Sequence, residues 1–438
     1  MSAALLERYH ATLAHRQSWH WTGSVIESLG QTIESLGPLS SVGECCEIID
    51  REGGRHLAEV IGFRGKNVLS MPIETTEGIR YGDTVAALGR GAGFEVGPGL
   101  LGRVLNALGE PLDDGPSLNL NESMPLDGTV RAALERTPIR TPLGTGIRSI
   151  DSMLTVGRGQ RVGIFGGSGV GKSTLIGMMT RNTEADVTVV GLVGERGREV
   201  GEFLEDALGV EGRKRSVVLV STSDESPLKR MRGALAATTV AEYYASQGKH
   251  VLLVLDSLTR YAMAAREIGL AAGEPPTAKG YTPSVFTKLA RLVERAGQFK
   301  NGSITAFYTV LMEGDDQQDP LVDAVRSLLD GHVMLSRAMA AEGWYPPIQV
   351  LDSISRLMPA VSTKKHQEHA SLMRRMMAVF ARSEDLVRIG AYKPGSDPDL
   401  DRSIEARPAL RNFLTQDAKD EVRFPDAIAG LAKLASEI

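Results

Sequence analysis

The stretch "RVGIFGGSGVGKSTLIGMM", residues 161–179, decides the fold of this chain. An apolar run typical of a β-strand leads into a glycine-rich turn, and a run typical of a helix follows the turn. From Gly166 to Ser173 the spacing Gly-x4-Gly-Lys-Ser matches the phosphate-loop pattern. The glycines let successive backbone N–H groups face an anion, and the helix N-terminus adds partial positive charge. The segment is therefore predicted to bind the phosphates of a nucleotide.

Two side chains of this loop have specific expected roles. Lys172 reaches the terminal phosphates, and the Ser173 hydroxyl holds Mg²⁺. The competing dinucleotide-binding fingerprint fits poorly, because Ser168 occupies the position of its second glycine and Lys172 would have no role in it. The nucleotide-binding residues expected from the pattern are Gly166, Gly167, Ser168, Gly169, Val170, Gly171, Lys172, Ser173 and Thr174.

Two carboxylates are expected near the loop. Glu195 ends the apolar run in "GLVGERGREVGEFLEDAL", and Asp256 ends the run in "HVLLVLDSLTR". Ligands of open α/β sheets bind outside the carboxyl ends of the strands, where this pattern places both side chains. Glu195 is a candidate to orient an attacking water, although a glutamate at a helix start is often only a solvated or capping residue. Asp256 is a candidate Mg²⁺ ligand through water.

The chain divides into parts with different periodicity. Short runs such as "ECCEIID" and "NVLSMPI" between turns predict a small antiparallel barrel. The runs "RVGIF", "DVTVVGLVG", "SVVLVS", "HVLLVLD" and "SITAFYTVL" alternate with helical patterns, which predicts a parallel sheet with crossover helices. The predicted fold class is α/β. The predicted parts are an amphipathic arm at 1–21, a β-barrel at 22–90, a P-loop nucleotide-binding domain at 91–361 and a helical domain at 362–438.

Two apolar stripes leave their role open. Leu5, Tyr9 and Leu13 recur at four-residue spacing, which predicts a short amphipathic helix over residues 4–16. That helix either packs on its own domain or docks on a partner or a membrane surface. The second stripe is rich in methionine and is more often core than binding surface. It comprises Leu372, Met373, Met376, Met377 and Phe380.

The composition excludes several classes. Acidic residues outnumber basic ones, 54 against 49, so no overall positive field favours nucleic acid, and no nucleic-acid partner is expected. Cys45 and Cys46 are adjacent in a strand-like run, so two buried thiols are expected rather than a disulfide. The N-terminus lacks the apolar core of a secretory signal, and no apolar run approaches the roughly 20 residues that cross a bilayer. A cytoplasmic protein is expected.

Further motifs resemble the type III protein-export ATPases, which are related to the catalytic subunit of rotary ATP synthases. The motifs are "GGSGVGKST", "GERGREV", "LLVLDSLTRYA", "GYTPSVFTKLARLVERAG", "YTVLMEGDD", "DGHVMLSR" and "YPPIQVLDSISRLMP". The resemblance covers residues 20–415, and the segment ending in "ERAG" discriminates best because it reads differently in synthase catalytic subunits. Thr282 and Ala290 stand where the export family usually carries prolines, a departure that concerns loop rigidity and no chemistry.

The resemblance implies a RecA-like P-loop domain and an Mg²⁺-dependent ATPase. It makes Glu195 the residue that polarises the attacking water, Arg196 a contact to the phosphate region and Asp256 the acid of the metal-binding strand. Arg337 resembles the arginine that a neighbouring subunit inserts into the site, an effect commonly reaching about 10³-fold. Tyr345 matches the aromatic residue on which the family stacks adenine. Without the resemblance, Arg337 would be expected to form a surface salt bridge and Tyr345 to lie in the core.

The resemblance also implies an assembly and partners. A chain holding both Glu195 and Arg337 can complete every site of a ring, so a homohexamer is predicted. The implied partners are a regulator or stator-like protein at the N-terminal arm, and a central stalk protein, export chaperones and substrates at the C-terminal domain. An export gate at the membrane would hold the cytoplasmic protein peripherally at the inner-membrane export apparatus. The "IGAY" sequence, residues 389–392, favours the flagellar members over the injectisome members.

Three other classes fit less well. A rotary ATP synthase catalytic subunit shares the site chemistry, but the "ERAG" segment and the lack of an acidic "DELSEED"-like lever disfavour it. A ring-shaped nucleic-acid translocase is disfavoured by the acidic net charge and by the lack of a basic patch interleaved with aromatic residues. A nucleotide-dependent scaffold that does not hydrolyse is disfavoured by the retention of Glu195.

Overall fold

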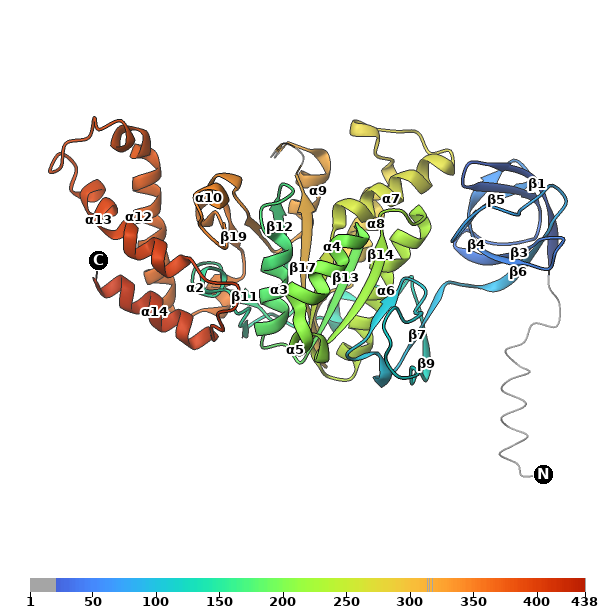
Figure 1. Cartoon of the computed structure of the whole chain (residues 1–438), viewed down its shortest axis with the longest axis horizontal. Coiled ribbons are helices and arrows are strands. Elements are labelled where there is room, and N and C mark those ends of the chain that lie inside the picture. Colours follow the sequence, from blue (N-terminus) through green and yellow to red (C-terminus); the bar gives the residue numbers. More distant parts are fainter. Residues whose placement is uncertain (1–20, 313, 315, 317, 438) are drawn as a thin grey trace, which may run out of the picture.

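The computed structural model describes residues 21–312, 314, 316 and 318–437. The molecule is elongated, and a barrel, a sheet covered by helices and a helical domain follow one another along its long axis (Figure 1). The predicted arm helix at residues 4–16 lies outside the described residues. Within the described part of the chain, no helix is long and apolar enough to span a membrane.

The N-terminal part is a closed antiparallel barrel with the strand order β1-β2-β5-β4-β3-β6. Val25, Ile33, Ile48 and Val85 point into its core and are almost fully buried, because alternate residues of each strand face inward. The predicted barrel and the two buried, unpaired cysteines are confirmed. The strands are β1 (Thr22–Leu29), β2 (Thr32–Leu36), β3 (Glu44–Ile49), β4 (Arg55–Arg64), β5 (Asn67–Pro72) and β6 (Thr84–Gly91).

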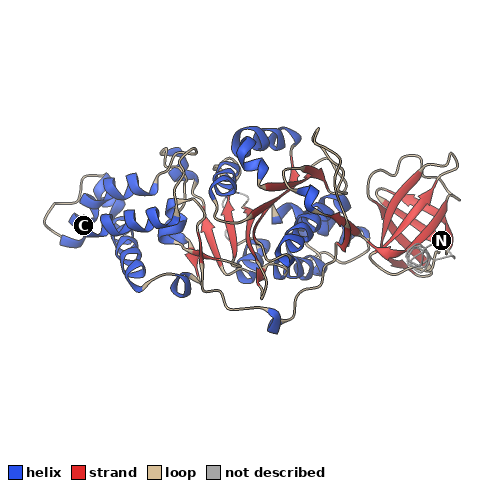
Figure 2. Ribbon diagram, turned by 90° about the horizontal axis from the view of Figure 1, so that it is seen from below, coloured by secondary structure: helices blue, strands red, loops and turns tan. Residues whose placement is uncertain are grey.

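The central sheet has the strand order β19-β18-β12-β17-β15-β13-β14-β8 and is parallel from β18 to β8. Its strands are almost wholly buried because helices cover both faces (Figure 2). The five predicted strands are confirmed as β12 (Arg161–Gly166), β13 (Val187–Glu195), β14 (Ser216–Thr222), β15 (His250–Asp256) and β17 (Ser303–Leu311).

Three strands of this sheet escaped sequence analysis because each is too short to show a period. They are β8 (Val104–Asn106), β18 (Gly331–Met334) and β19 (Ile354–Ser355). β8 forms one edge of the sheet although the glycine-rich sequence around it is typical of turns. Smaller pairings outside this path use β7 (Gly93–Val96) with β9 (Glu122–Pro125), β10 (Pro142–Leu143) with β11 (Val156–Gly157), and β16 (Gly297–Gln298) with β17.

The helices of the central part include crossovers between the parallel strands. They are α2 (Arg148–Met153), α3 (Lys172–Asn182), α4 (Gly197–Glu202), the π-helix η3 (Phe203–Leu208), α5 (Gly209–Lys214), α6 (Pro227–Ser246), α7 (Leu258–Ala271), α8 (Pro283–Glu294), α9 (Pro320–Leu328), α10 (Arg337–Ala341) and α11 (Met358–Val361). Single 3₁₀ turns lie at Pro98–Leu100, Ala133–Glu135, Ala278–Gly280 and Val350–Asp352.

The C-terminal part consists of α12 (Lys364–Arg388), α13 (Pro398–Leu414) and α14 (Phe424–Glu437). Met373 and Met376 are buried in the same apolar cluster as Leu410 and Leu431, so the methionine stripe is mainly core, as predicted. This cluster continues into the central part through Trp344 and Ile348. The helical domain therefore shares a core with the nucleotide-binding domain.

A buried ion pair joins the barrel to the central part. Arg232 of α6 donates from Nη2 to Oε2 of Glu59 on β4 at 2.8 Å and lies 3.3 Å from Sγ of Cys45 on β3. The side chains of Arg232 and Glu59 are only 5% and 16% exposed. Burial raises the pKa of Glu59, and the adjacent guanidinium partly offsets this rise.

We expect Arg232→Ala to destabilise the protein by about 3 kcal/mol, because it leaves the Glu59 carboxylate buried without a partner. The folded-state pKa of Glu59 then lies further above its unfolded value, so the loss of stability grows as the pH rises and is larger at pH 8 than at pH 5. Thermal unfolding at the two pH values measures this. Lys214→Ala breaks only the exposed pair with Glu211 and should change nothing, so equal effects of the two variants would contradict the prediction.

Candidate functional site

The phosphate loop connects β12 to α3 at the carboxyl edge of the sheet. Gly169 and Gly171 have φ angles of 77° and 89°, a left-handed conformation that favours glycine. Lys172 is the first residue of α3 and is 8% exposed. Its Nζ donates to the carbonyl oxygens of Gly166 at 3.3 Å and Gly167 at 3.2 Å. Burial lowers the pKa of Lys172, while Asp256 and Glu195 act in the opposite direction.

Glu195 is the last residue of β13, and a bulge in the pairing with β14 lies just before it. Gly194 makes this bulge with a φ of 72°, and a Cβ there would lie 2.8 Å from Cβ of Arg260. Burial, together with the nearby Asp256 and Glu199 carboxylates, raises the pKa of the Glu195 carboxyl to about 8. A carboxyl with this pKa can accept a proton near neutral pH.

Asp256 ends β15, the strand paired with β13, and its side chain is almost fully buried. Its Oδ1 accepts a 2.6 Å hydrogen bond from the Thr309 hydroxyl of β17. Burial raises the pKa of Asp256, and the Thr309 hydrogen bond and the Lys172 ammonium lower it. Three strand ends therefore bring Lys172, Asp256 and Glu195 to one edge of the sheet, as expected from the sequence pattern.

Sequence analysis assigned no role to two charged residues of this edge. Arg260 in the first turn of α7 lowers the pKa of both Glu195 and Asp256 by its positive charge. Its Nε is buried and has no hydrogen-bond partner among the described residues. Glu199 of α4 hydrogen-bonds Glu195 and raises its pKa. Both residues stand inside quoted motifs, but only the fold shows that they face the carboxylates.

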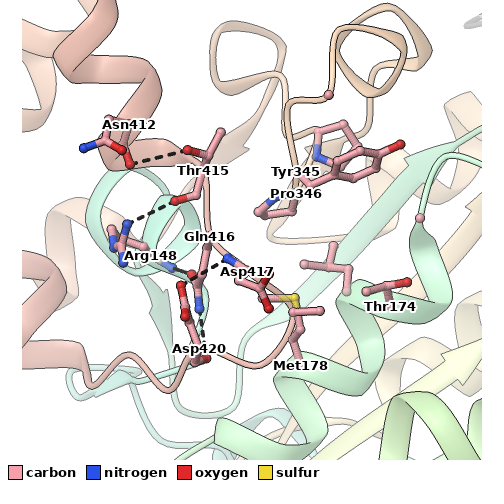
Figure 3. A pocket seen from close by; sticks show the side chains of 15 residues that line it. Arg148, Thr174, Met178, Tyr345, Pro346, Asn412, Thr415, Gln416, Asp417 and Asp420 are labelled. Carbon is pink, nitrogen blue, oxygen red and sulfur yellow. Dashed lines mark hydrogen bonds between the residues drawn. The ribbon is translucent and has the colours of Figure 1, made fainter.

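Tyr345 lies beside the phosphate loop and lines a pocket of about 780 Å³ (Figure 3). A Cβ on Gly171 would lie 3.9 Å from its ring, and the side chain is 50% exposed. The exposed ring does not support the alternative reading as core. The pocket is lined by the loop and α3, by residues 343–347, by α2, and by the end of α13 with the segment that follows it. The lining residues are Arg148, Gly171, Thr174, Leu175, Met178, Gly343, Tyr345, Pro346, Pro347, Asn412, Thr415, Gln416, Asp417, Ala418 and Asp420.

Two predicted arginines lie at the surface of the chain. Arg196 is exposed and precedes the first residue of α4, directly after Glu195. Arg337 is exposed and begins α10, where the Ser336 hydroxyl accepts from the backbone N–H of Met339. Arg337 does not line the pocket around Tyr345.

The donor set suits a magnesium ion that binds together with phosphates. Among the described residues, no group of three or more His, Cys, Asp or Glu side chains is arranged to hold a metal. The exposed Ser173 hydroxyl and the second oxygen of Asp256 remain as oxygen ligands at the loop. Mg²⁺ typically binds one or two protein oxygens and takes its other ligands from phosphates and water, so these residues fit.

Three family profiles match successive parts of the chain. Residues 25–89 match the beta-barrel domain of the ATP synthase alpha/beta family, and residues 146–355 match its nucleotide-binding domain. Residues 362–433 match the C-terminal domain of the T3SS EscN ATPase.

Individual relatives cover nearly the whole chain. The flagellum-specific ATP synthase of Treponema pallidum is 51% identical over 99% of this chain and 97% of its own length. The type 3 secretion system ATPase of Xanthomonas euvesicatoria is 47% identical over 94% of this chain and 92% of its own. The assembled EscN ATPase of enteropathogenic E. coli matches with a TM-score of 0.89 at 42% identity, covering 94% of this chain and all of EscN. EscN in complex with its central stalk EscO matches with a TM-score of 0.87 at 41% identity, covering 94% and 100% of the two chains.

We expect Gly194→Ala to destabilise the protein by about 1–3 kcal/mol, since alanine is strained at a positive φ and its Cβ meets Arg260. Gly201→Ala in α4 is the matched control, because a Cβ there meets no atom within 4 Å. Thermal unfolding of both variants measures the difference. A Gly194→Ala protein as stable as wild type would show that the bulge does not hold Glu195 as described.

Proposed function

This chain belongs to the ATP synthase alpha/beta family and, within it, to the type III protein-export ATPases, and from this premise we propose that it hydrolyses ATP to energise protein export by the bacterial flagellum. The observation that carries the proposal is the meeting of Lys172, Asp256 and Glu195 at one sheet edge beside a pocket that holds Tyr345. The family assigns the reaction, and these residues provide the groups that it needs.

ATP binds with its phosphates on the loop and its base against Tyr345. The backbone N–H groups of the loop and the Lys172 ammonium compensate the phosphate charge. The Lys172 side chain already lies against its own loop. Its Nζ therefore needs little conformational change to donate to phosphate oxygens in place of the two carbonyl oxygens. Ser173 and Asp256 would hold Mg²⁺, and this ion would neutralise charge on the terminal phosphates.

Glu195 orients and polarises the water that attacks the γ-phosphate. Its raised pKa suits a group that takes up part of a proton near neutral pH. The positive charge of Arg260 favours the ionised forms of Glu195 and Asp256, and it thereby supports this role. The buried Arg260 Nε without a protein partner is a further donor at this edge.

Arg337 acts in a neighbouring subunit of a homohexamer. It is exposed at the start of α10 and lies outside the pocket of its own chain, as a residue that serves another subunit must. An arginine inserted in this way stabilises the charge that develops on the transferred phosphoryl group. Arg196, also exposed, contacts the phosphate region from its own chain. The assembled form of the relative EscN supports a ring.

The flagellar assignment rests on the relatives and on "IGAY". Five of the relatives, at 45–51% identity, are named flagellum-specific ATP synthases. An injectisome role is the second candidate, because type 3 secretion ATPases are 44–49% identical. Deleting the gene in its own organism separates the two candidates, since a flagellar ATPase is required for filament assembly and an injectisome ATPase for effector secretion.

The partners follow from the same assignment. A central stalk protein is one partner, as the complex of EscN with EscO supports, and its proposed contact is with the C-terminal helices. Export chaperones and substrates engage the same domain, and a regulator or stator-like protein binds the arm at residues 1–21. The export gate then holds the ring at the inner membrane from the cytoplasmic side.

Mixing two inactive variants tests the shared site. Arg337→Ala and Glu195→Gln should each lose most of the turnover, Arg337→Ala by about 10³-fold. In a random equimolar hexamer, about a quarter of the interfaces pair an intact Glu195 with an intact Arg337, so ATP turnover should recover to about a quarter of wild type. Steady-state phosphate release of the mixture measures it.

The matched control mixes Glu195→Gln with Lys172→Ala. Glu195 and Lys172 belong to the same subunit's part of the site, so every interface carries one of the two substitutions. Turnover should therefore stay at the level of the single variants. If the Arg337→Ala mixture recovers no more activity than this control, Arg337 does not act between subunits.

The pH dependence tests the role of Glu195. Because its pKa is raised to about 8 and the ionised form is the active one, kcat/KM should rise with pH through about 8. Glu199→Gln removes a negative neighbour and its hydrogen bond, so the midpoint should move to lower pH. A midpoint that stays in place in Glu199→Gln would remove Glu195 from this role.

A further inference from the structure

We propose that Gln416 is a positioning residue, which fixes the base-stacking Tyr345 and thereby makes nucleotide affinity depend on the docking of the C-terminal helices. The inference rests on the proposed function, in which ATP places its base against Tyr345. Gln416 lies in the segment between α13 and α14 and lines the pocket around Tyr345 (Figure 3).

Gln416 joins three separate parts of the chain while it is only 5% exposed. Its backbone N–H donates to the carbonyl oxygen of Tyr345 at 2.9 Å. Its side-chain Oε1 accepts from the backbone N–H of Arg148 at 2.8 Å, and its Nε2 donates to the carbonyl oxygen of Gly146 at 2.8 Å. Both ends of the amide are therefore satisfied by backbone groups at the start of α2.

The anchor that Gln416 uses is itself rigid. The buried Asp151 carboxylate accepts from the backbone N–H groups of Thr145 at 2.9 Å and Gly146 at 3.2 Å. It also accepts from the Thr145 hydroxyl at 2.7 Å. The carbonyl that receives the Gln416 amide thus belongs to a turn fixed from inside the domain, and the Tyr345 backbone is tied to this turn through Gln416.

Side chains of α2 and α3 hold the same segment, residues 413–420. Arg148 donates from Nη1 to the carbonyl oxygens of Phe413 at 3.0 Å and Thr415 at 3.1 Å. Arg181 donates to the carbonyl oxygen of Ala418 at 2.6 Å, and Asn182 donates to that of Asp420 at 3.0 Å.

Arg181 and Asn182 end the helix that begins at Lys172, so one rigid element connects the phosphate end of the site to this segment. Figure 3 shows Arg148 and Thr415 on one side of the pocket and Tyr345 and Thr174 on the other. Base binding and docking of the C-terminal helices are therefore linked, and each favours the other.

Equilibrium binding of two probes tests this role. We expect Gln416→Ala to weaken Mg²⁺-ATP binding by about tenfold, because the buried partners of the amide are left unpaired and the backbone segment that binds Tyr345 loses its side-chain anchor at the start of α2. Binding of Mg²⁺-tripolyphosphate, which has no base, should change by less than about twofold. Gln416→Glu keeps the acceptor for Arg148 but places a buried carboxylate oxygen against the carbonyl oxygens of Gly146 and Asp420, so it should weaken ATP binding at least as much as Gln416→Ala.

Lys419→Ala is the matched control, because Lys419 is exposed in the same segment and does not line the pocket. It should leave both affinities unchanged. Gln416→Glu also decides the question if Gln416→Ala fails to fold, since it conserves shape and one hydrogen bond.

A double-mutant cycle with Tyr345→Ala separates positioning from general stability. If Gln416 acts through the ring, its effect on ATP binding should largely disappear in the Tyr345→Ala background. Additive effects, or equal losses for ATP and tripolyphosphate, would overturn the inference while leaving the proposed function intact. A wild-type chain that binds neither probe would overturn the proposed function and this inference with it.

Discussion

The buried ammonium of Lys172, held by the carbonyl oxygens of its own loop, is the constraint on which the site depends. A cation that is 8% exposed is costly unless negative charge lies nearby, and the sheet provides that charge at two further strand ends. Asp256 and Glu195 come from adjacent parallel strands, so their positions relative to Lys172 are set by strand pairing rather than by flexible loops. The result is a group of opposite charges that partly balance one another at the carboxyl edge of the sheet.

The same charges give the two acids different surroundings. Asp256 is tied to Thr309 and faces Lys172, which favour its ionised form, whereas Glu195 sits beside two other carboxylates. Burial raises the pKa of both acids, and the charge of Glu199 acts in the same direction on each. The two acids thus differ in their contacts: Asp256 is anchored by Thr309 and faces Lys172, whereas Glu195 lies beside Asp256 and Glu199.

Local patterns were enough to predict the barrel, the five long strands and the residues of the phosphate loop, because each rests on spacing within one segment. The positions of Glu195 and Asp256 followed from the rule that ligands meet the carboxyl ends of parallel strands. Arg260 and Gln416 could not be found in this way, since their roles depend on contacts between segments that lie far apart in sequence. Glu199 is only four residues from Glu195, but no pattern shows that the turn between β13 and α4 brings the two carboxyls together. The short strand β8 was missed because three residues in a glycine-rich segment show no period.

We propose that a complete site needs residues of two chains. Specific ATPase activity as a function of protein concentration, with the oligomeric state measured by mass photometry on the same samples, tests it most directly. Activity per chain should rise steeply with concentration and follow the hexamer fraction. Activity per chain that is constant across a range where the protein is monomeric would contradict it.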